Sequence, residues 1–336
     1  MRTVVCDTPG SVRMEERPVP VPADGEVLIR IRRIGICGTD MHIFRGTQPF
    51  LSYPRVMGHE LSGQVESAPS GSTLVAGDQV YVMPYLSCGS CIACRAGKTN
   101  CCTRIEVLGV HRDGGMTELI ALPECFVVKT EGISLDEAAM IEFLAIGAHA
   151  VTRGAVKAGA NVLVVGAGPI GMAVMLFAKL KGANVTVLDA RADRLAFCRT
   201  TFGIERTVAT GPEDKAALAA YTNDEFFDLV FDATGNIKAM ERGLEFVAHG
   251  GTYVLVSIVR DMLSFSDPEF HKRETTLLGS RNATVADFEE VVAAMKAGLV
   301  PTTLLNTHRT TLDAFTSVLP LWMEPSSGVI KAIVEV

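Results

Sequence analysis

The chain has 336 residues, and 48% of them are hydrophobic, which is enough for two domains of ordinary size that each bury a core. Lys and Arg number 31 against 38 Asp and Glu, so the formal net charge is -7 at pH 7, and no basic tract is present. Phosphate backbones and anionic membranes are poor partners for such a surface. We therefore expect no nucleic-acid partner and no membrane partner.

The first segment, residues 1–22, begins like a strand and continues as a charged, proline-rich stretch. It lacks the apolar run and the small-residue cleavage site of an export signal. The nine cysteines, an odd number, favour reduced thiols over a disulfide framework. Together these features predict a cytoplasmic protein.

The next segments, "GICGTDMHIF" and "YPRVMGHELSG", contain Cys37, His59 and Glu60, and a later helical pattern places Glu142 on an apolar face. Taken singly, Cys37 is compatible with a small core residue, His59 with a turn histidine and Glu142 with a solvated helix face. Together, a thiol, an imidazole and carboxylates predict a zinc site that keeps one coordination position open. Open zinc sites in proteins are catalytic.

Five of the nine cysteines lie in the loop "CGSCIACRAGKTNCC", between two strand-like segments. Cys88, Cys91 and Cys94 are separated by two residues each, and either Cys102 or Cys101 is available as a fourth ligand. Four thiolates from one tight loop suit a closed, tetrahedral zinc site. Unligated thiols and an iron–sulfur cluster are the alternatives. The spacing predicts structural zinc.

A strand over 161–165 runs directly into "GAGPIG" and a helical pattern, and Gly166, Gly168 and Gly171 match G-x-G-x-x-G. Residues 158–178 carry no charge, but the glycines and a proline interrupt them, so strand, turn and helix describe them better than a membrane span. Such a turn places a cofactor pyrophosphate at the helix N-terminus. The segment predicts dinucleotide binding.

The second strand of this region ends at Asp189, where a carboxylate accepts hydrogen bonds from the adenosine ribose and repels a 2′-phosphate. We therefore expect NAD, with Arg191 and Arg194 keeping NADP as an alternative. Two further strands, "FDLVFDATG" and "GGTYVLVSIV", end in small residues, as parallel strands do at a ligand cleft. We expect these cofactor contacts: Gly166, Gly168, Pro169, Ile170, Gly171, Asp189, Arg194 and Thr234.

The pattern of elements predicts an α/β protein with two domains. A doubly wound parallel-sheet (Rossmann) domain is expected over 147–280. Residues 1–146 form a second, mainly β domain, to which 281–336 return. No internal repeat or low-complexity tract competes with this division.

The motifs "GICGTDMH", "GHE", the cysteine loop, "VGAGPIG", "FDATG" and "GGTYV" stand in the order found in zinc-dependent medium-chain dehydrogenases, which the chain resembles over essentially its whole length. The resemblance implies a GroES-like catalytic domain, two zinc ions per subunit and a homo-oligomer, either dimer or tetramer. It also selects Cys102 over Cys101 as the fourth ligand of the cysteine loop.

Glu142, in place of a second catalytic cysteine, is similar to the sorbitol and threonine dehydrogenase branch. The segments "TQPFLSYPRVMGHE" and "FSDPEFHKRETTLLGSRNAT" further resemble the L-galactonate and L-gulonate 5-dehydrogenases. Branch members commonly read Glu-Pro where this chain has Glu142-Phe143. The missing proline removes a backbone constraint beside the expected ligand.

The expected reaction is oxidation of a secondary alcohol of a sugar acid to the keto acid, with hydride transfer to NAD. Zinc lowers the pKa of the alcohol, and Thr39 and His42 carry the proton away, as the family's relay implies. Asp40 either orients a metal ligand or shapes the turn. Because Cys37 and Glu142 already neutralise the zinc charge, we expect Glu60 beside the metal, or bound to it only when substrate is absent.

The substrate carboxylate requires a cation, and Arg281, after the last strand of the sheet, is the candidate. Three alternatives remain at this point. They are an NAD-dependent polyol or L-threonine dehydrogenase, a metal-free NADPH quinone-type reductase, and a non-catalytic NAD-binding or sensing protein. The fold alone does not choose among them, because function belongs to the site.

Overall fold

The computed structural model describes residues 1–336, which divide into two compact units. Unit 1 comprises residues 1–142 and 292–336, and unit 2 comprises residues 143–291. The boundaries expected from sequence lie after residues 146 and 280. Two helices explain the difference, because α4 (Ile141–Arg153) and α10 (Val285–Lys296) each continue across a boundary of the structure.

Unit 1 is mainly β. Its largest sheet has the order β10 (Val127–Lys129), β6 (Gln79–Val82), β5 (Glu60–Ser67), β3 (Glu26–Ile36), β18 (Lys331–Glu335) and β17 (Asn306–Thr311), and β9 (Leu119–Pro123) also pairs with β3. The pairs are antiparallel except β17 with β18. A three-stranded sheet has the order β2 (Ser11–Glu16), β1 (Arg2–Thr8), β4 (Arg55–Val56), and β7 (Tyr85–Leu86) pairs with β8 (Glu106–Val107).

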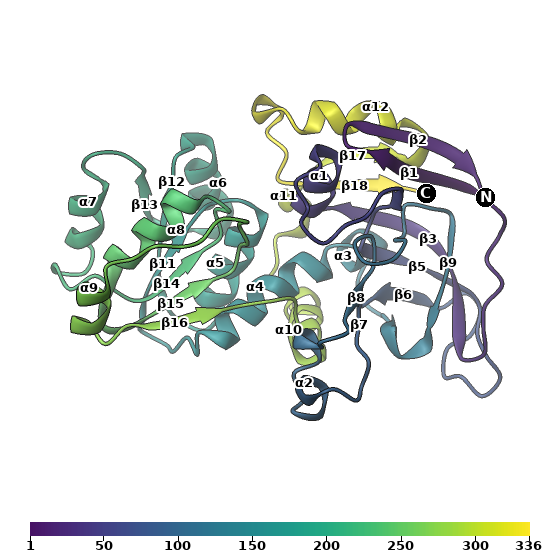
Figure 1. Cartoon of the computed structure of the whole chain (residues 1–336), viewed down its shortest axis with the longest axis horizontal. Coiled ribbons are helices and arrows are strands. Elements are labelled where there is room, and N and C mark those ends of the chain that lie inside the picture. Colours follow the sequence, from purple (N-terminus) through teal and green to yellow (C-terminus); the bar gives the residue numbers. More distant parts are fainter. The chain divides into compact units, whose positions relative to one another are not determined.

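The helices of unit 1 are short apart from α12 (Leu312–Trp322) and α1 (Gly38–Arg45); the others are α2 (Ile92–Arg95), α3 (Leu135–Ala138) and α11 (Thr302–Leu305). The core joins alternate residues of β3, such as Ile29 and Ile31, to Phe315 of α12. A strand turns every second side chain to the same face, and β3 accordingly alternates the buried Ile29 and Ile31 with the less buried Arg30 and Arg32. Segments from both ends of the sequence thus share one core, as Figure 1 shows for β1, β3, β18 and α12.

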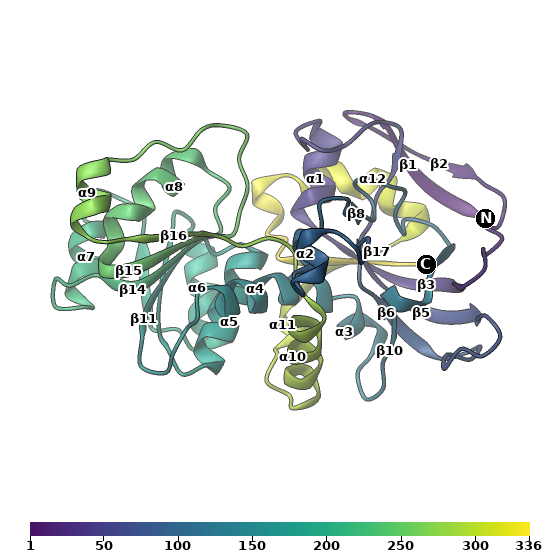
Figure 2. The ribbon, with the colours of Figure 1, turned by 60° about the horizontal axis from the view of Figure 1, so that its bottom comes forward.

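Unit 2 is a six-stranded parallel sheet. Its order is β13 (Arg206–Ala209), β12 (Asn184–Asp189), β11 (Asn161–Val165), β14 (Phe227–Asp232), β15 (Val247–Leu255), β16 (Thr276–Gly279). The helices α5 (Pro169–Leu180) and α6 (Ala192–Phe202) cover one face, and α8 (Ile237–Gly243) and α9 (Asp267–Lys272) lie on the other (Figure 2). The strand order changes direction between β11 and β14: β12 and β13 lie on one side of β11, and β14, β15 and β16 lie on the other. Folds of this kind bind dinucleotides at this point. The predicted fold class is confirmed.

One ion pair of unit 2, between the buried Asp214 and the partly exposed Arg242, makes the stability of the unit depend on pH. Asp214, at the start of α7 (Asp214–Ala220), accepts hydrogen bonds from the Arg242 guanidinium, with Nη1 2.7 Å from Oδ2, and from the Gly211 amide at 3.0 Å. The Arg242 hydrogen bond is the largest cause that lowers the pKa of Asp214. A depressed carboxyl pKa stabilises the fold above the unfolded value of about 4 and ceases to do so as pH falls through the folded value.

Asp214→Asn is therefore expected to lower the free energy of unfolding by about 1.5–3 kcal/mol at pH 7. The difference from the wild type should shrink as pH falls below about 4, because both proteins then carry an uncharged group. Urea unfolding at a series of pH values measures this. A difference that stays constant across the series contradicts the assignment.

Candidate active site and cofactor site

Asp40 fixes two segments of unit 1 that the sequence separates. Cys37 is the N-cap residue of α1, and its amide donates to Asp40 Oδ2 at 2.9 Å. The other carboxylate oxygen, Oδ1, accepts from the amide of Gly58 at 3.2 Å, and Asp40 is fully buried. The residue that shapes the turn thus also holds the backbone next to His59.

Cys37, His59 and Glu60 offer ligand atoms that all lie within 4.8 Å of one another. His59 is 4% exposed, and its Nδ1 has no hydrogen-bond partner, although a buried nitrogen normally has one. Burial by itself lowers the pKa of His59, but Cys37, Asp40 and Glu142 together raise it well above the ordinary value. The site therefore favours positive charge, and its sulfur, nitrogen and oxygen donors fit zinc.

Glu60 is held by a lysine from the far end of the chain. Lys331 Nζ forms an ion pair with Glu60 Oε2 and donates to the carbonyl of Ile36 at 3.1 Å. Both side chains are essentially inaccessible, at 0% and 1% exposure. Gly35 makes room for the carboxylate, since a Cβ there would lie 2.1 Å from Glu60 Oε2. The sequence did not indicate Lys331, because one lysine at the start of a strand normally reads as solvated.

Glu142 lies in the first turn of α4 and is 6% exposed, but it is not among the three residues grouped within 4.8 Å. Its Oε1 accepts a hydrogen bond from the hydroxyl of Tyr85, another buried residue. Its charge still contributes to raising the pKa of both His59 and Glu60. No pattern in the sequence pointed to Tyr85, since the two partners are 57 positions apart.

The two residues expected to move the proton follow Cys37 on α1. His42 Nδ1 lies 2.9 Å from Thr47 Oγ1, and partial burial followed by the charge of Arg45 lowers the pKa of His42. Thr39 is half-buried one position before Asp40. A histidine that prefers its neutral form is able to accept a proton near neutral pH.

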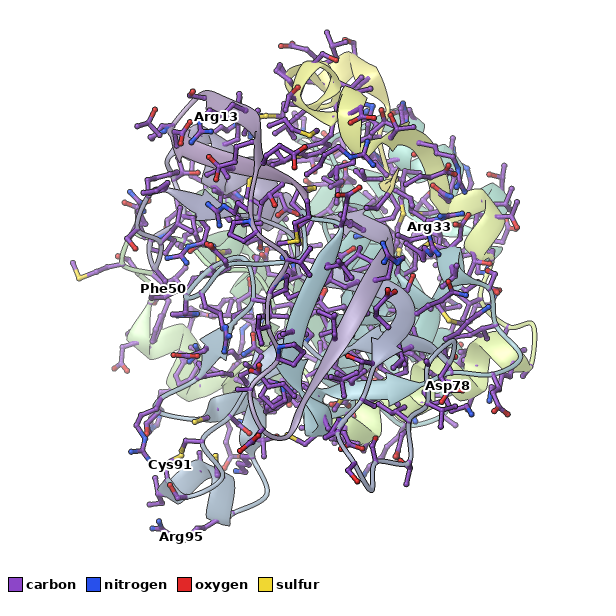
Figure 3. The ribbon with its side chains drawn as sticks, turned by 90° about the vertical axis from the view of Figure 1, so that its right-hand side faces the viewer. Arg13, Arg33, Phe50, Asp78, Cys91 and Arg95 are labelled. Carbon is purple, nitrogen blue, oxygen red and sulfur yellow. The ribbon has the colours of Figure 1, made fainter.

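The cysteine loop brings four thiols together. Ligand atoms of Cys88, Cys91, Cys94 and Cys102 lie within 4.8 Å of one another, and Cys101 lies outside this group and is exposed. Figure 3 shows Cys91 and Arg95 at the edge of unit 1. The amides of Cys88 and Arg104 each donate to Cys102 Sγ at 3.3 Å. Four sulfur donors gathered in one loop are a ligand set of structural zinc sites.

In unit 2, the glycine motif lies where a cofactor phosphate would bind. Gly168 is the N-cap of α5 and Pro169 its first residue, followed by Ile170. Gly166 has φ of 100°, and a Cβ on Gly171 would lie 1.8 Å from the carbonyl oxygen of Gly166, so helix and strand pack too closely for a side chain. The helix N-terminus is left open to an anion.

A cavity of about 600 Å³ follows this turn. Gly166, Gly168, Asp189, Arg194 and Thr234 line it, together with residues of α8 that include Lys238. Pro169, Ile170 and Gly171 are not part of its lining. The cavity lies at the carboxyl ends of the parallel strands, as expected for a dinucleotide site.

Hydrogen bonds hold the side chains of Asp189 and Thr234, which line the cavity. Asp189 accepts from the Ala167 amide at 2.6 Å and from the Arg191 amide at 2.7 Å, so its carboxylate ties the glycine turn to the end of β12. Thr234 donates its hydroxyl to Asp232, at 3.0 Å from Oδ1. Burial lowers the pKa of Arg194, which is 9% exposed.

Arg281, the residue expected to bind a substrate carboxylate, is exposed and follows the end of β16 in unit 2. It does not line the cofactor cavity.

No helix of the structure is both long enough and apolar enough to cross a membrane.

Comparison with known families assigns the class. The model of the alcohol dehydrogenase GroES-like domain matches residues 23–132, and the model of zinc-binding dehydrogenases matches residues 169–297. Together with the relatives described next, these matches show that the chain belongs to the zinc-dependent alcohol dehydrogenase family and is an oxidoreductase. The predicted GroES-like and Rossmann pair is confirmed.

Individual relatives narrow the comparison. The chain is 43% identical to L-galactonate-5-dehydrogenase of Escherichia coli K12, over 92% of this chain and 91% of that protein. It is 30% identical to 2-dehydro-3-deoxy-L-galactonate 5-dehydrogenase of Pseudoalteromonas atlantica, over 83% and 82%. Among solved structures, the RspB alcohol dehydrogenase of E. coli CFT073 in complex with NADH superimposes with a TM-score of 0.93 at 28% identity, covering 100% and 99% of the two chains.

Proposed function

We propose that this protein oxidises a secondary alcohol of a sugar acid, of the L-galactonate or L-gulonate type, to the keto acid and reduces NAD. The observation that carries the proposal is the group of the partly buried Cys37 with the buried His59 and Glu60, in a chain whose other unit has a cavity at the carboxyl ends of a parallel sheet. The 43% identity to an L-galactonate-5-dehydrogenase supports the substrate class.

Cys37, His59 and Glu142 are proposed to hold the zinc ion of this site, with Glu60 beside it. Zinc bound there would supply the Lewis acidity that eases removal of the alcohol proton. The C–H bond breaks with transfer of hydride to the nicotinamide ring, and the O–H proton passes by way of Thr39 to His42. Asp40 keeps the segments of Cys37 and His59 in register during this exchange.

Cys88, Cys91, Cys94 and Cys102 are proposed to hold a second, structural zinc ion. A closed set of four thiolates leaves no position for a substrate. The binding free energy of structural zinc, about 10–16 kcal/mol in small zinc fingers, is large enough to order a loop with little apolar core.

NAD is proposed as the cofactor because a carboxylate stands at the end of β12. Asp189 is positioned to accept ribose hydroxyls and to repel a 2′-phosphate. Gly166, Gly168, Pro169, Ile170 and Gly171 are proposed to hold the pyrophosphate, and Arg194 and Thr234 to line the nucleoside part. The NADH bound in the RspB structure supports this choice.

The test is NADH formation with L-galactonate, L-gulonate, sorbitol, L-threonine and simple alcohols, each with and without a chelator. We expect the hexonates to be the best substrates and the chelator to abolish their oxidation. Preference for sorbitol favours the polyol alternative, and NAD binding without any turnover favours a sensing protein.

Arg281 is proposed to bind the substrate carboxylate, since a guanidinium forms paired hydrogen bonds with a carboxylate. Arg281→Ala should raise KM for hexonates by about 10–100-fold, the loss expected for a charged hydrogen bond of about 1.5–3 kcal/mol. Oxidation of neutral polyols should be unaffected. Lys272→Ala, at another exposed cation before β16, is the control, and equal losses on both substrate classes contradict the assignment.

We propose further that the enzyme is a cytoplasmic homo-oligomer, a dimer or tetramer. The edge strand β16 exposes 37% of Leu277, and the nearby loop exposes Ile258 at 66% and Met262 at 90%. Unpaired strand edges flanked by apolar side chains commonly associate. Light scattering coupled to size exclusion measures the state, and a monomer at micromolar concentration contradicts it.

A further inference from the structure

Tyr85 contacts Glu142, which is proposed to hold zinc, although Tyr85 itself is not one of the expected ligands. Its hydroxyl donates to Glu142 Oε1, and both residues are buried, at 7% and 6% exposure. A phenol O–H donates and a carboxylate oxygen accepts, so the bond runs from Tyr85 to Glu142.

The hydrogen bond from Tyr85 constrains the carboxylate of Glu142, which the backbone by itself leaves free to rotate. Glu142 stands in the first turn of α4, and Phe143 follows it where a proline would have restricted the chain. A donor that holds Oε1 fixes the rotation of the carboxylate, so that Oε2 is the oxygen available to a cation. Hydrogen bonds to ligating carboxylates orient them in this way in metal sites generally.

Tyr85 is itself held by the cysteine loop. It lies on β7, in register with Val107 of β8, and these two strands join the loop to the rest of unit 1. Figure 1 shows β7 and β8 side by side above α2 of the loop. Cys88 follows Tyr85 by three residues, and Cys102 precedes β8 by four. The thiol cluster thus lies at the loop end of the short ladder, where it follows β7 and precedes β8.

We propose that Tyr85 is a positioning residue for the open metal site. Its hydroxyl orients Glu142 toward the metal held by Cys37 and His59, and the β7–β8 ladder makes this orientation depend on the cysteine loop. The inference rests on the proposed zinc site but not on the identity of the substrate.

Tyr85→Phe removes the hydroxyl and keeps the ring. We expect the zinc affinity of the open site to fall by about 10–100-fold, so that a mild chelator reduces the zinc content from two ions per chain to one. Cobalt substituted at the open site should show an altered absorption spectrum, because one oxygen ligand is no longer held. Metal content and the cobalt spectrum are both measured without substrate.

Tyr253→Phe is the matched control, since the Tyr253 hydroxyl is also buried and donates to the carbonyl of Met240 at 2.7 Å in unit 2. It should lose a comparable hydroxyl bond and keep both zinc ions. In a double-mutant cycle with Glu142→Gln, Tyr85→Phe should cause no further loss of zinc affinity, because it acts through Glu142.

Wild-type zinc affinity and cobalt spectrum in Tyr85→Phe, or losses that add to those of Glu142→Gln, overturn the inference and leave the proposed function intact. A wild-type protein that retains zinc only in the cysteine loop overturns both. Failure to oxidise any sugar acid, with the zinc effects as expected, overturns the proposed substrate and supports the role of Tyr85.

Discussion

Replacing Cys37 with serine is expected to lower kcat for sugar-acid oxidation by at least about 10³-fold. Zinc lowers the pKa of a bound water molecule to about 7, far below its value in bulk water, so losing the metal makes removal of a hydroxyl proton much harder. The serine hydroxyl is a poor ligand for a site built from sulfur and nitrogen donors. Steady-state NADH formation, together with zinc content, measures the effect.

Cys125→Ser is the matched control for this experiment, because Cys125 is an exposed cysteine of unit 1 that belongs to neither thiol group. It should retain full activity and both zinc ions. The Cys37→Ser protein should retain the zinc of the cysteine loop and its fold. Full turnover by Cys37→Ser would show that the reaction does not use this site.

Replacing Lys331 with methionine is expected to lower the free energy of unfolding by about 3–5 kcal/mol. The substitution leaves Glu60 as a buried carboxylate without its ammonium partner, in a space that only Gly35 makes wide enough. Burial already is the largest cause that raises the pKa of Glu60, and Lys331 is the main group that opposes it. Denaturant unfolding of the zinc-loaded protein measures the loss.

Two further variants test whether the charge of Lys331 and the burial of its ion pair account for this loss of stability. Lys331→Arg keeps the charge and should recover most of the stability. Lys129→Met removes a lysine paired with Asp78 at 2.9 Å, but its side chain is 42% exposed, so the cost should stay below about 1 kcal/mol. Equal losses of unfolding free energy for Lys331→Met and Lys129→Met would mean that the buried ion pair contributes no more to stability than the exposed one.

Features carried by one contiguous segment were predictable. Gly166, Gly168 and Gly171 mark the turn between β11 and α5, and at Gly166 and Gly171 the backbone angle or the close packing requires glycine. The cysteine spacing likewise places four thiols in one loop before any tertiary contact is known. The parallel sheet of unit 2 follows from strands that alternate with helices along the chain.

Features made by distant segments were not predictable from spacing. Lys331 becomes buried only because β18 inserts between β3 and β17, and nothing local distinguishes it from a surface lysine. Tyr85 lies on β7 and Glu142 on α4, 57 positions later, and no local pattern in the sequence connects the two. Conversely, the structure groups Glu60 with Cys37 and His59, whereas the sequence argument favoured Glu142 as the third ligand.

The late position of β18 governs how unit 1 is made on the ribosome. The nascent chain presents Glu60 first, then all of unit 2, and only afterwards the strand that supplies the ammonium group. Until that strand arrives, β3 is paired with β5 and β9 only, its segment 33–36 lacks the partner that β18 supplies, and the carboxylate has to stay hydrated. Unit 2 is thus free to fold during synthesis, whereas unit 1 cannot complete its largest sheet until β18 has been synthesised.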